Sequence, residues 1–150
     1  MGIYLENLER DQIDNVASFK ENTISKIRTS NSTRRMTYLE LNADLSIHPI
    51  YNSEQIPENC RISFTRMRLS SHYLKIETGR WSRIPRENRL CECGQVQSEI
   101  HVLLTCPLLH NLRLIFHELN FDNINELMKS DNIIALAKYI HAVLKQTNPI

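Results

Sequence analysis

The sequence predicts a small, mainly α-helical domain, and three observations support this prediction. Leu, Ile, Glu, Lys, Arg and Asn are plentiful, a composition that favours helices over strands. Only three glycines occur in 150 residues, so few positions require a backbone conformation that other residues avoid. Apolar side chains recur at helical spacing near both ends of the chain. A chain of this length fits one hydrophobic core.

Residues 1–35 are expected to form an amphipathic helix and a loop, and residues 36–150 a helical domain. The first helix is predicted over residues 5–28, where the near-helical apolar positions are Leu5, Leu8, Ile13, Val16, Ala17, Ile24 and Ile27. The run TSNST at residues 29–33 is typical of a loop. A short helix is predicted over residues 36–45.

Prolines separate the elements in the middle of the chain. Residues 46–57 hold two prolines and little periodicity, which indicates a connection. A proline is tolerated at the start of a helix, so Pro57 fits a helix over residues 58–71. Its polar face is expected to carry Arg61, Arg66 and Arg68. Pro85 prevents residues 79–89 from being regular helix throughout.

Capping residues divide the next part of the chain. Ser98 is a suitable N-cap for a short helix over residues 99–105. Pro107 then opens a helix over residues 108–119. These two helices are expected to be separate because proline disfavours a helical backbone at the residue before it.

The last helix is the most strongly patterned. Asp122 or Asn123 is expected to cap a brief turn that ends near Met128. Asp131 is expected to cap the final helix. Its apolar stripe consists of Ile133, Ile134, Leu136, Ala137, Ile140 and Leu144. No internal repeat or low-complexity segment is recognisable.

Three of the four cysteines lie within sixteen residues, with a histidine between them. Their spacing is Cys91-x-Cys93-x7-His101-x4-Cys106. Three thiolates and one imidazole form a complete tetrahedral ligand set for Zn²⁺. This spacing predicts a zinc-knuckle loop embedded in the helical domain. With four protein ligands no coordination position stays open, so the expected role of zinc is structural.

The local sequence allows these ligands to converge. Alternate residues of an extended segment point to the same side, so the first two cysteines can share one ion. Gly94 then frees the backbone to turn. Cys106 lies five residues after His101 and off its helical face, so the helix must end first. Pro107 favours that ending.

Other interpretations of the cysteines stay open. A disulfide would need an oxidising compartment, for which the sequence gives no sign. A catalytic cysteine needs one thiol beside a base rather than three around a histidine. A zinc deaminase would show His-x-Glu, whereas this chain has Glu99-x-His101. Buried cysteines that pack as small apolar residues are the simplest alternative, and Cys60 is assigned that role.

The absence of long apolar runs also bounds the interpretation. No segment approaches the roughly 20 apolar residues that cross a bilayer, and the first residues do not resemble a signal peptide. We therefore expect an intracellular protein, nuclear or cytoplasmic, with reduced thiols and no membrane partner.

Positive charge is concentrated in one part of the chain. Residues 61–89 contain eight basic and two acidic residues, a net charge of +6, whereas the whole chain carries +1. Such a concentration is typical of a surface that meets phosphates. Arg80, Arg83, Arg86 and Arg89 recur at every third residue. If Pro85 imposes a polyproline-like path with three residues per turn, these four arginines line one edge.

Nucleic acid is the expected partner of this stretch, with contacts from Arg66, Arg68 and the four arginines. Trp81 is expected either to stack on a base or to cap the core. The alternative is a solvated loop in which Glu77 and Glu87 pair with the arginines. His72 is expected to be a core or capping residue.

Several of these segments together resemble a known family. The run Arg86–Gly94, the run Glu99–Pro107 and the pair Leu112-Arg113 resemble the C-terminal zinc-knuckle segment of non-LTR retrotransposon reverse transcriptases. The stretch Phe64–Trp81 is similar to the approach to that knuckle, and Ala137–Ile140 to the tail that follows it. The resemblance covers about residue 36 to the end. Many members have two residues between the first two cysteines, where this chain has one.

The resemblance implies an accessory module that holds RNA or DNA near a reverse transcriptase core of the same element. An adjacent Asp-Asp pair and the length for a polymerase or an endonuclease are missing from this sequence. We therefore expect a non-catalytic, zinc-stabilised module that contacts RNA or DNA and has no small-molecule substrate. The alternative is a structural or protein–protein interaction module that zinc holds together, without nucleic-acid binding.

Overall fold

The structure, a computed structural model, describes residues 2–42 and 45–147, with the side chains of residues 2–12, 14 and 33 left out. The described residues form helices and turns without a β-strand, which confirms the predicted mainly α fold. The helices are α1 Gly2–Arg28, α2 Thr33–Leu41, α3 Glu58–Arg68, α4 Lys75–Trp81, α5 His110–Ile115, α6 Ile124–Met128 and α7 Ile133–Thr147. The shorter turns are η1 Pro49–Asn52, η2 Arg86–Asn88, η3 His101–Thr105 and η4 Pro107–Leu109.

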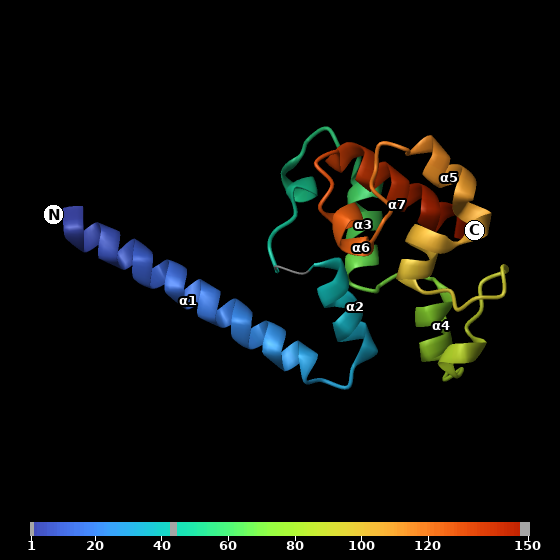
Figure 1. Cartoon of the computed structure of the whole chain (residues 1–150), viewed down its shortest axis with the longest axis horizontal. Coiled ribbons are helices and arrows are strands. Elements are labelled where there is room, and N and C mark those ends of the chain that lie inside the picture. The colour runs from blue at the N-terminus through green and yellow to red at the C-terminus, as the bar shows by residue number, and fades with distance from the viewer. Residues whose placement is uncertain (1, 43–44, 148–150) are drawn as a thin grey trace.

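The core lies where α7 packs against α3 (Figure 1). The predicted apolar stripe of α7 contributes Leu136, Ala137 and Ile140, all completely buried. Phe64 and Met67 of α3 meet them with no exposed surface. Cys60 is buried in the same core, as predicted. Burial of these side chains stabilises the fold, because one large apolar side chain contributes about 1.5–3 kcal/mol.

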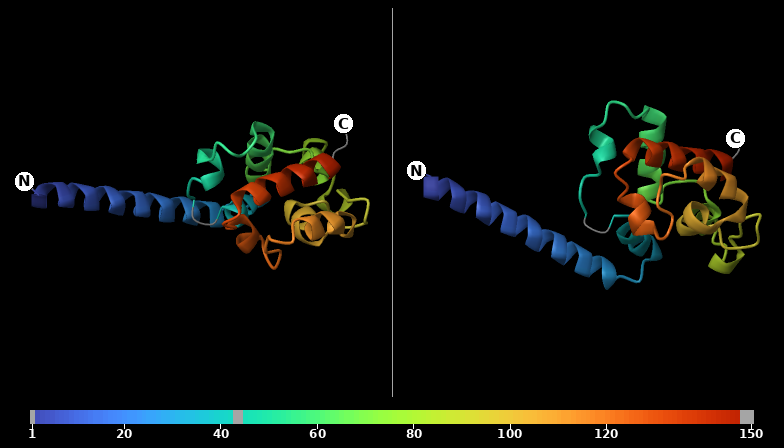
Figure 2. Two further views of the ribbon diagram at one scale, coloured as in Figure 1. Left: turned by 90° about the horizontal axis from the view of Figure 1, so that it is seen from above. Right: turned by 45° about the horizontal axis from the view of Figure 1, so that its top comes forward.

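Helix α1 projects from this body as a single long rod (Figures 1 and 2). It packs against α2. Of its predicted apolar face, Ile13 and Val16 are 67 % and 55 % exposed, whereas Ile24 and Ile27 are half-buried. Phe19, which the pattern did not include, is 70 % exposed. The predicted positions Leu5 and Leu8 lie outside the described side chains.

Some predicted boundaries differ from the structure. Helix α2 begins three residues before the predicted start, and residues 43–44 of the predicted helix lie outside the described residues. The helix predicted over residues 108–119 is instead η4 followed by the short α5. Asn123 caps α6 by accepting the Glu126 N–H at 2.9 Å. The predicted cap Asp131 is wrong, because Asn132 accepts the Ala135 N–H at 3.1 Å at the start of α7.

Helix α4 is an element that the sequence pattern did not predict. It begins after the buried Leu74 and ends at Trp81. Gly79 allows the side chain of Arg89 to approach, because a Cβ there would lie 2.6 Å from Arg89 Cγ. Arg89 in turn donates to the carbonyl oxygens of Ile76 and Ile84, both at 2.8 Å. The segment before the cysteines is thereby closed onto α4.

Candidate metal centre

The first two cysteines lie in a tight loop. An antiparallel bridge pairs Leu90 with Val96, and the Cys91 N–H donates to the Gln95 carbonyl at 2.6 Å. Gly94 closes the loop with its N–H on the Cys91 carbonyl oxygen at 2.9 Å. Its φ of +87° lies in the left-handed region that glycine adopts without strain, as the predicted turn requires.

The loop corrects one part of the predicted geometry. The chain does not stay extended through Cys93, because Glu92 and Cys93 form the first half of the turn. The two sulfurs therefore approach each other by backbone reversal and not by strand alternation. The Gln95 backbone also hydrogen-bonds to Cys93, which lowers the pKa of its thiol against the opposing effect of burial.

The other two ligands lie at the ends of η3. Ser98 accepts the His101 N–H at 3.2 Å, which confirms it as the predicted cap. The Cys106 N–H donates to the His101 carbonyl across five residues at 2.8 Å, so this turn is π-helical. Cys106 itself is extended, with φ −60° and ψ 120°, because Pro107 follows it. The prediction that the helix ends before Cys106 is thus confirmed. The π-helical form of the turn was not predicted.

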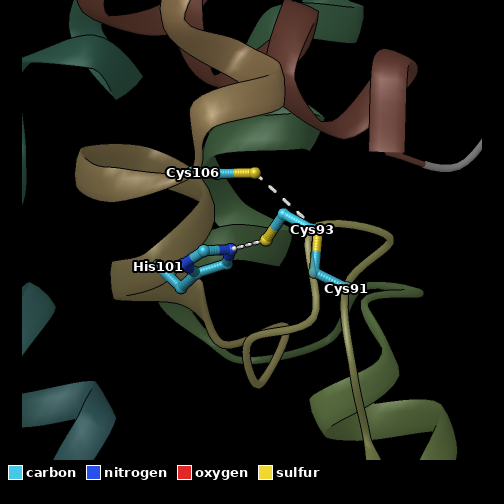
Figure 3. A group of neighbouring side chains, drawn as sticks. All are labelled: Cys91, Cys93, His101 and Cys106. Atoms are coloured by element: carbon cyan, nitrogen blue, oxygen red, sulfur yellow. Dashed lines mark hydrogen bonds between the residues drawn. The ribbon is translucent and has the colours of Figure 1, made fainter.

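The four predicted ligand side chains converge on one point (Figure 3). Their sulfur and nitrogen atoms all lie within 4.8 Å of one another. Cys91 Sγ lies 3.7 Å from Cys106 Sγ, and Cys93 Sγ lies 3.1 Å from His101 Nε2. Such a group can hold a metal ion.

The orientation of the histidine ring is set by a residue that the sequence pattern did not single out. His101 Nδ1 lies 3.2 Å from Thr105 Oγ1, one helical turn further along. A hydroxyl that accepts the Nδ1–H leaves Nε2 as the lone-pair atom, and Nε2 is the atom that faces Cys93. The spacing of four residues after a candidate ligand on a helix is the signal that points to Thr105.

The surroundings of Cys106 and His101 shift the pKa values of both side chains. Burial raises the pKa of the Cys106 thiol to about 11, and hydrogen bonds and charge from Cys91 act in the same direction. Burial lowers the pKa of His101, and the positive charge of Arg113 adds to this effect. Neutral imidazole is the form that binds metals, so this environment favours ligation by His101, whereas Cys106 must lose a proton when a metal binds.

Core residues fix both sides of the centre. Cys106 is 1 % exposed and Cys91 7 %, and Val102 and Leu103 between the ligands are completely buried. The hydroxyl of Tyr139 on α7 donates to the Leu103 carbonyl oxygen. The Arg113 guanidinium donates to the Cys106 carbonyl oxygen at 2.7 Å. The centre is therefore attached to the main core through α5 and α7.

A buried polar cluster lies on the other side of η3. Glu99 is 3 % exposed and accepts hydrogen bonds from Ser70 at 2.8 Å and His72 at 3.1 Å. His72 is 1 % exposed, which confirms the predicted core role. The cluster ties the end of α3 to the helix that carries His101.

Two arginines predicted to contact nucleic acid have structural roles instead. Arg68 is 6 % exposed and lies beside the side chain of Asn42, to which it donates, so its predicted place on a polar surface is wrong. Arg89 is half-buried and holds the carbonyl oxygens of Ile76 and Ile84. Neither guanidinium is placed for a phosphate backbone.

The predicted polyproline path from Arg80 to Arg89 is also wrong. Arg80 belongs to α4 and pairs with Glu77 at 3.1 Å. Arg83 has a left-handed backbone with φ of +56°, and Arg86 begins the turn η2. A left-handed residue turns the chain back, so the four arginines do not share the continuous edge expected of a threefold helix. Arg83 and Arg86 are nevertheless exposed.

Trp81 and Arg66 keep the exposure that a binding role needs. Trp81 is 60 % exposed, so it does not cap the core. Its ring packs edge to face on Tyr73, which is 56 % exposed, with centroids 6.3 Å apart. Arg66 is exposed in the last turn of α3.

Comparison with known proteins returned no match among protein families, curated proteins or solved structures. Within the described residues, no helix is both long and apolar enough to cross a membrane.

Proposed function

We propose that this chain is a zinc-stabilised, non-catalytic module that contacts RNA or DNA. The convergence of Cys91, Cys93, His101 and Cys106 carries this proposal. Zinc–sulfur bonds of about 2.3 Å place two sulfurs of a tetrahedral site about 3.8 Å apart. The Sγ separation of 3.7 Å between Cys91 and Cys106 agrees with that value. Three thiolates with one imidazole are also the soft donor set that favours zinc over Mg²⁺ or Ca²⁺.

The proposed role of the ion is structural. A catalytic zinc keeps a position for water or substrate, whereas four protein ligands fill a tetrahedron. Among the described residues, the feature most similar to a catalytic pair is Ser63 Oγ at 2.8 Å from His141 Nδ1. Ser63 is 9 % exposed, and this bond joins α3 to α7, so we assign the pair a structural role.

The nucleic-acid part of the proposal is supported by charge and exposure. Residues 61–89 carry a net charge of +6, which attracts phosphates through space even without a regular edge of arginines. Arg66, Arg83 and Arg86 are the exposed predicted contacts. Trp81 with Tyr73 offers an exposed aromatic surface on which a base can stack.

A filter-binding titration against salt tests this proposal. The zinc-loaded protein should bind RNA or DNA at about 50 mM salt and lose affinity steeply as salt rises. Replacement of both Arg83 and Arg86 by Ala should weaken binding, and loss of each phosphate contact should reduce the salt slope by about 0.7–0.9. No binding at low salt, or binding that is insensitive to salt, would exclude nucleic acid as the partner.

We further propose that the module derives from the tail of a non-LTR retrotransposon reverse transcriptase. The order of ligands and flanking segments described from the sequence supports this origin. In that setting the module would hold template or target beside a polymerase core of the same element. Addition of the module in trans to such a core should increase cDNA yield on a bound template, and Cys106→Ser should abolish the increase.

A protein-interaction role is the second candidate, and α1 favours it. Its exposed Ile13, Val16 and Phe19 form an uncovered apolar surface on a projecting helix. Light scattering coupled to size-exclusion chromatography separates the two candidates. A nucleic-acid-free dimer that Val16→Glu dissociates would support the interaction role, and a monomer at all concentrations would contradict self-association.

A further inference from the structure

An open groove of about 420 Å³ lies along one face of α3. Its lining residues are Tyr51, Arg61, Ile62, Thr65, Arg66, Leu69 and Ser71. Most of them come from α3, while Tyr51 comes from η1 and Ser71 from the connection to α4. Only Arg66 of this set was among the predicted nucleic-acid contacts.

The groove uses the helix face that the core leaves free. The side chains of Cys60, Phe64 and Met67 on α3 are buried in the core, where α3 packs against α7. Ile62 and Leu69 lie on another face and stay 43 % and 49 % exposed. Positions 62, 65 or 66, and 69 follow the spacing that places residues in one row on a helix. This row forms the floor of the groove.

Tyr51 is held at the groove by three contacts. Its ring meets Phe64 edge to face with centroids 6.1 Å apart, and the buried Arg68 guanidinium lies over it at 5.9 Å. Thr65 Oγ1 donates to its hydroxyl at 3.2 Å. The side chain remains 37 % exposed despite these contacts. A ring fixed in this way presents an aromatic surface without further loss of conformational entropy on binding.

The groove is positively charged. Arg61 and Arg66 line it, and no acidic residue is among its described lining. Arg61 is anchored by a bond from Nη1 to the Ser53 carbonyl oxygen at 3.3 Å, whereas Arg66 is exposed. Positive charge beside a fixed aromatic ring and a mostly apolar floor is the combination that single-stranded nucleic-acid sites use.

The geometry points to this α3 groove as a binding site for single-stranded RNA or DNA. A base lies on the Tyr51 ring against Ile62, and the neighbouring phosphates meet Arg66 and Arg61. Single strands are favoured over duplexes because an unpaired base has a free face to stack. This inference rests on the proposed nucleic-acid function and adds contacts on α3 to those of Arg83 and Arg86.

Fluorescence anisotropy with a labelled single-stranded oligonucleotide tests the site on the full zinc-loaded chain. Tyr51→Ala and Arg66→Ala are each expected to weaken binding about tenfold. An unlabelled single strand should compete far better than a duplex of the same length. Ultraviolet cross-linking of an oligouridine to the wild type, mapped by mass spectrometry, should label the peptide that contains Tyr51.

Lys145→Ala is the matched control, because Lys145 is an exposed cation in the last turn of α7 as Arg66 is in α3. It should bind like the wild type. If both groove variants bind as tightly as the wild type and the cross-links map elsewhere, the α3 groove is not the binding site, although the proposed function stands. Absence of any wild-type binding would overturn both the groove and the proposed function. Equal competition by duplex would overturn the single-strand preference.

Discussion

Single residues around the candidate metal centre determine how well the four proposed ligands can meet one ion. Thr105 is the clearest case, because its hydroxyl holds the Nδ1 side of His101 while Nε2 faces Cys93. Ligand-orienting residues of this kind commonly change metal affinity by 10- to 100-fold in other proteins. The effect arises because an unoriented ring spends part of its time in rotamers and tautomers that cannot bind.

We predict that Thr105→Val weakens zinc binding about tenfold, since valine keeps the shape but removes the hydrogen bond. Competition against a chromophoric chelator measures the change. Thr105→Ser should restore most of the affinity because it retains the hydroxyl. Equal affinity in the valine variant and the wild type would show that the hydroxyl does not orient the ring.

Tyr139 links the centre to the core and gives a pH-dependent test. Burial raises its pKa to about 12, against the opposing charge of Arg113, while an unfolded tyrosine titrates near 10. The contribution of this pKa difference to the free energy of unfolding is therefore fully present below about pH 10, and it is lost as pH rises towards 12. Urea unfolding should show stability falling over this window.

Tyr139→Phe supplies the control for this titration. The variant should lose about 1 kcal/mol at neutral pH, because the Leu103 carbonyl loses its partner. Its stability should then decline less than that of the wild type above pH 10. If the stability of the wild type and of the Tyr139→Phe variant falls equally above pH 10, groups other than Tyr139 cause the loss.

The elements of the knuckle could be predicted to different degrees. Ser98, Gly94 and Pro107 act locally, so the cap, the turn and the helix ending were all readable from neighbouring residues. The π form of η3 was not, because one extra residue in a helical turn depends on what the turn packs against. Helix α4 was missed for a related reason, since Lys75–Trp81 is too short to show a periodic pattern.

Gly94 gives the prediction at the scale of the loop. Gly94→Ala should cost about 1 kcal/mol and weaken zinc binding, because its φ of +87° strains any residue with a Cβ. No atom lies within 4 Å of the added methyl group, so the cost is conformational and not steric. Gly94→Asn should be milder, since asparagine tolerates this backbone better. Thermal melts and chelator competition measure stability and zinc affinity for both variants. An asparagine variant impaired at least as much as the alanine variant would contradict the conformational cause.

In the whole molecule, the candidate metal centre connects two regions of different character. On one side lies the apolar core of α3 and α7, and on the other the basic segment that includes α4 and η2. The convergence of the four candidate ligands was predictable because all four residues lie close in sequence. The places of Arg68 and Arg89 were not, because long-range partners such as Asn42 and Ile76 decide whether an arginine is buried.

The zinc content of the purified protein tests the central claim most directly. The wild type should hold about one tightly bound zinc ion per chain, and chelation should unfold at least the middle of the chain. Cys106→Ser should lose most of the metal, whereas Cys60→Ala, a change of a core cysteine outside the cluster, should retain it. A wild-type protein that is folded and binds no zinc would contradict the account.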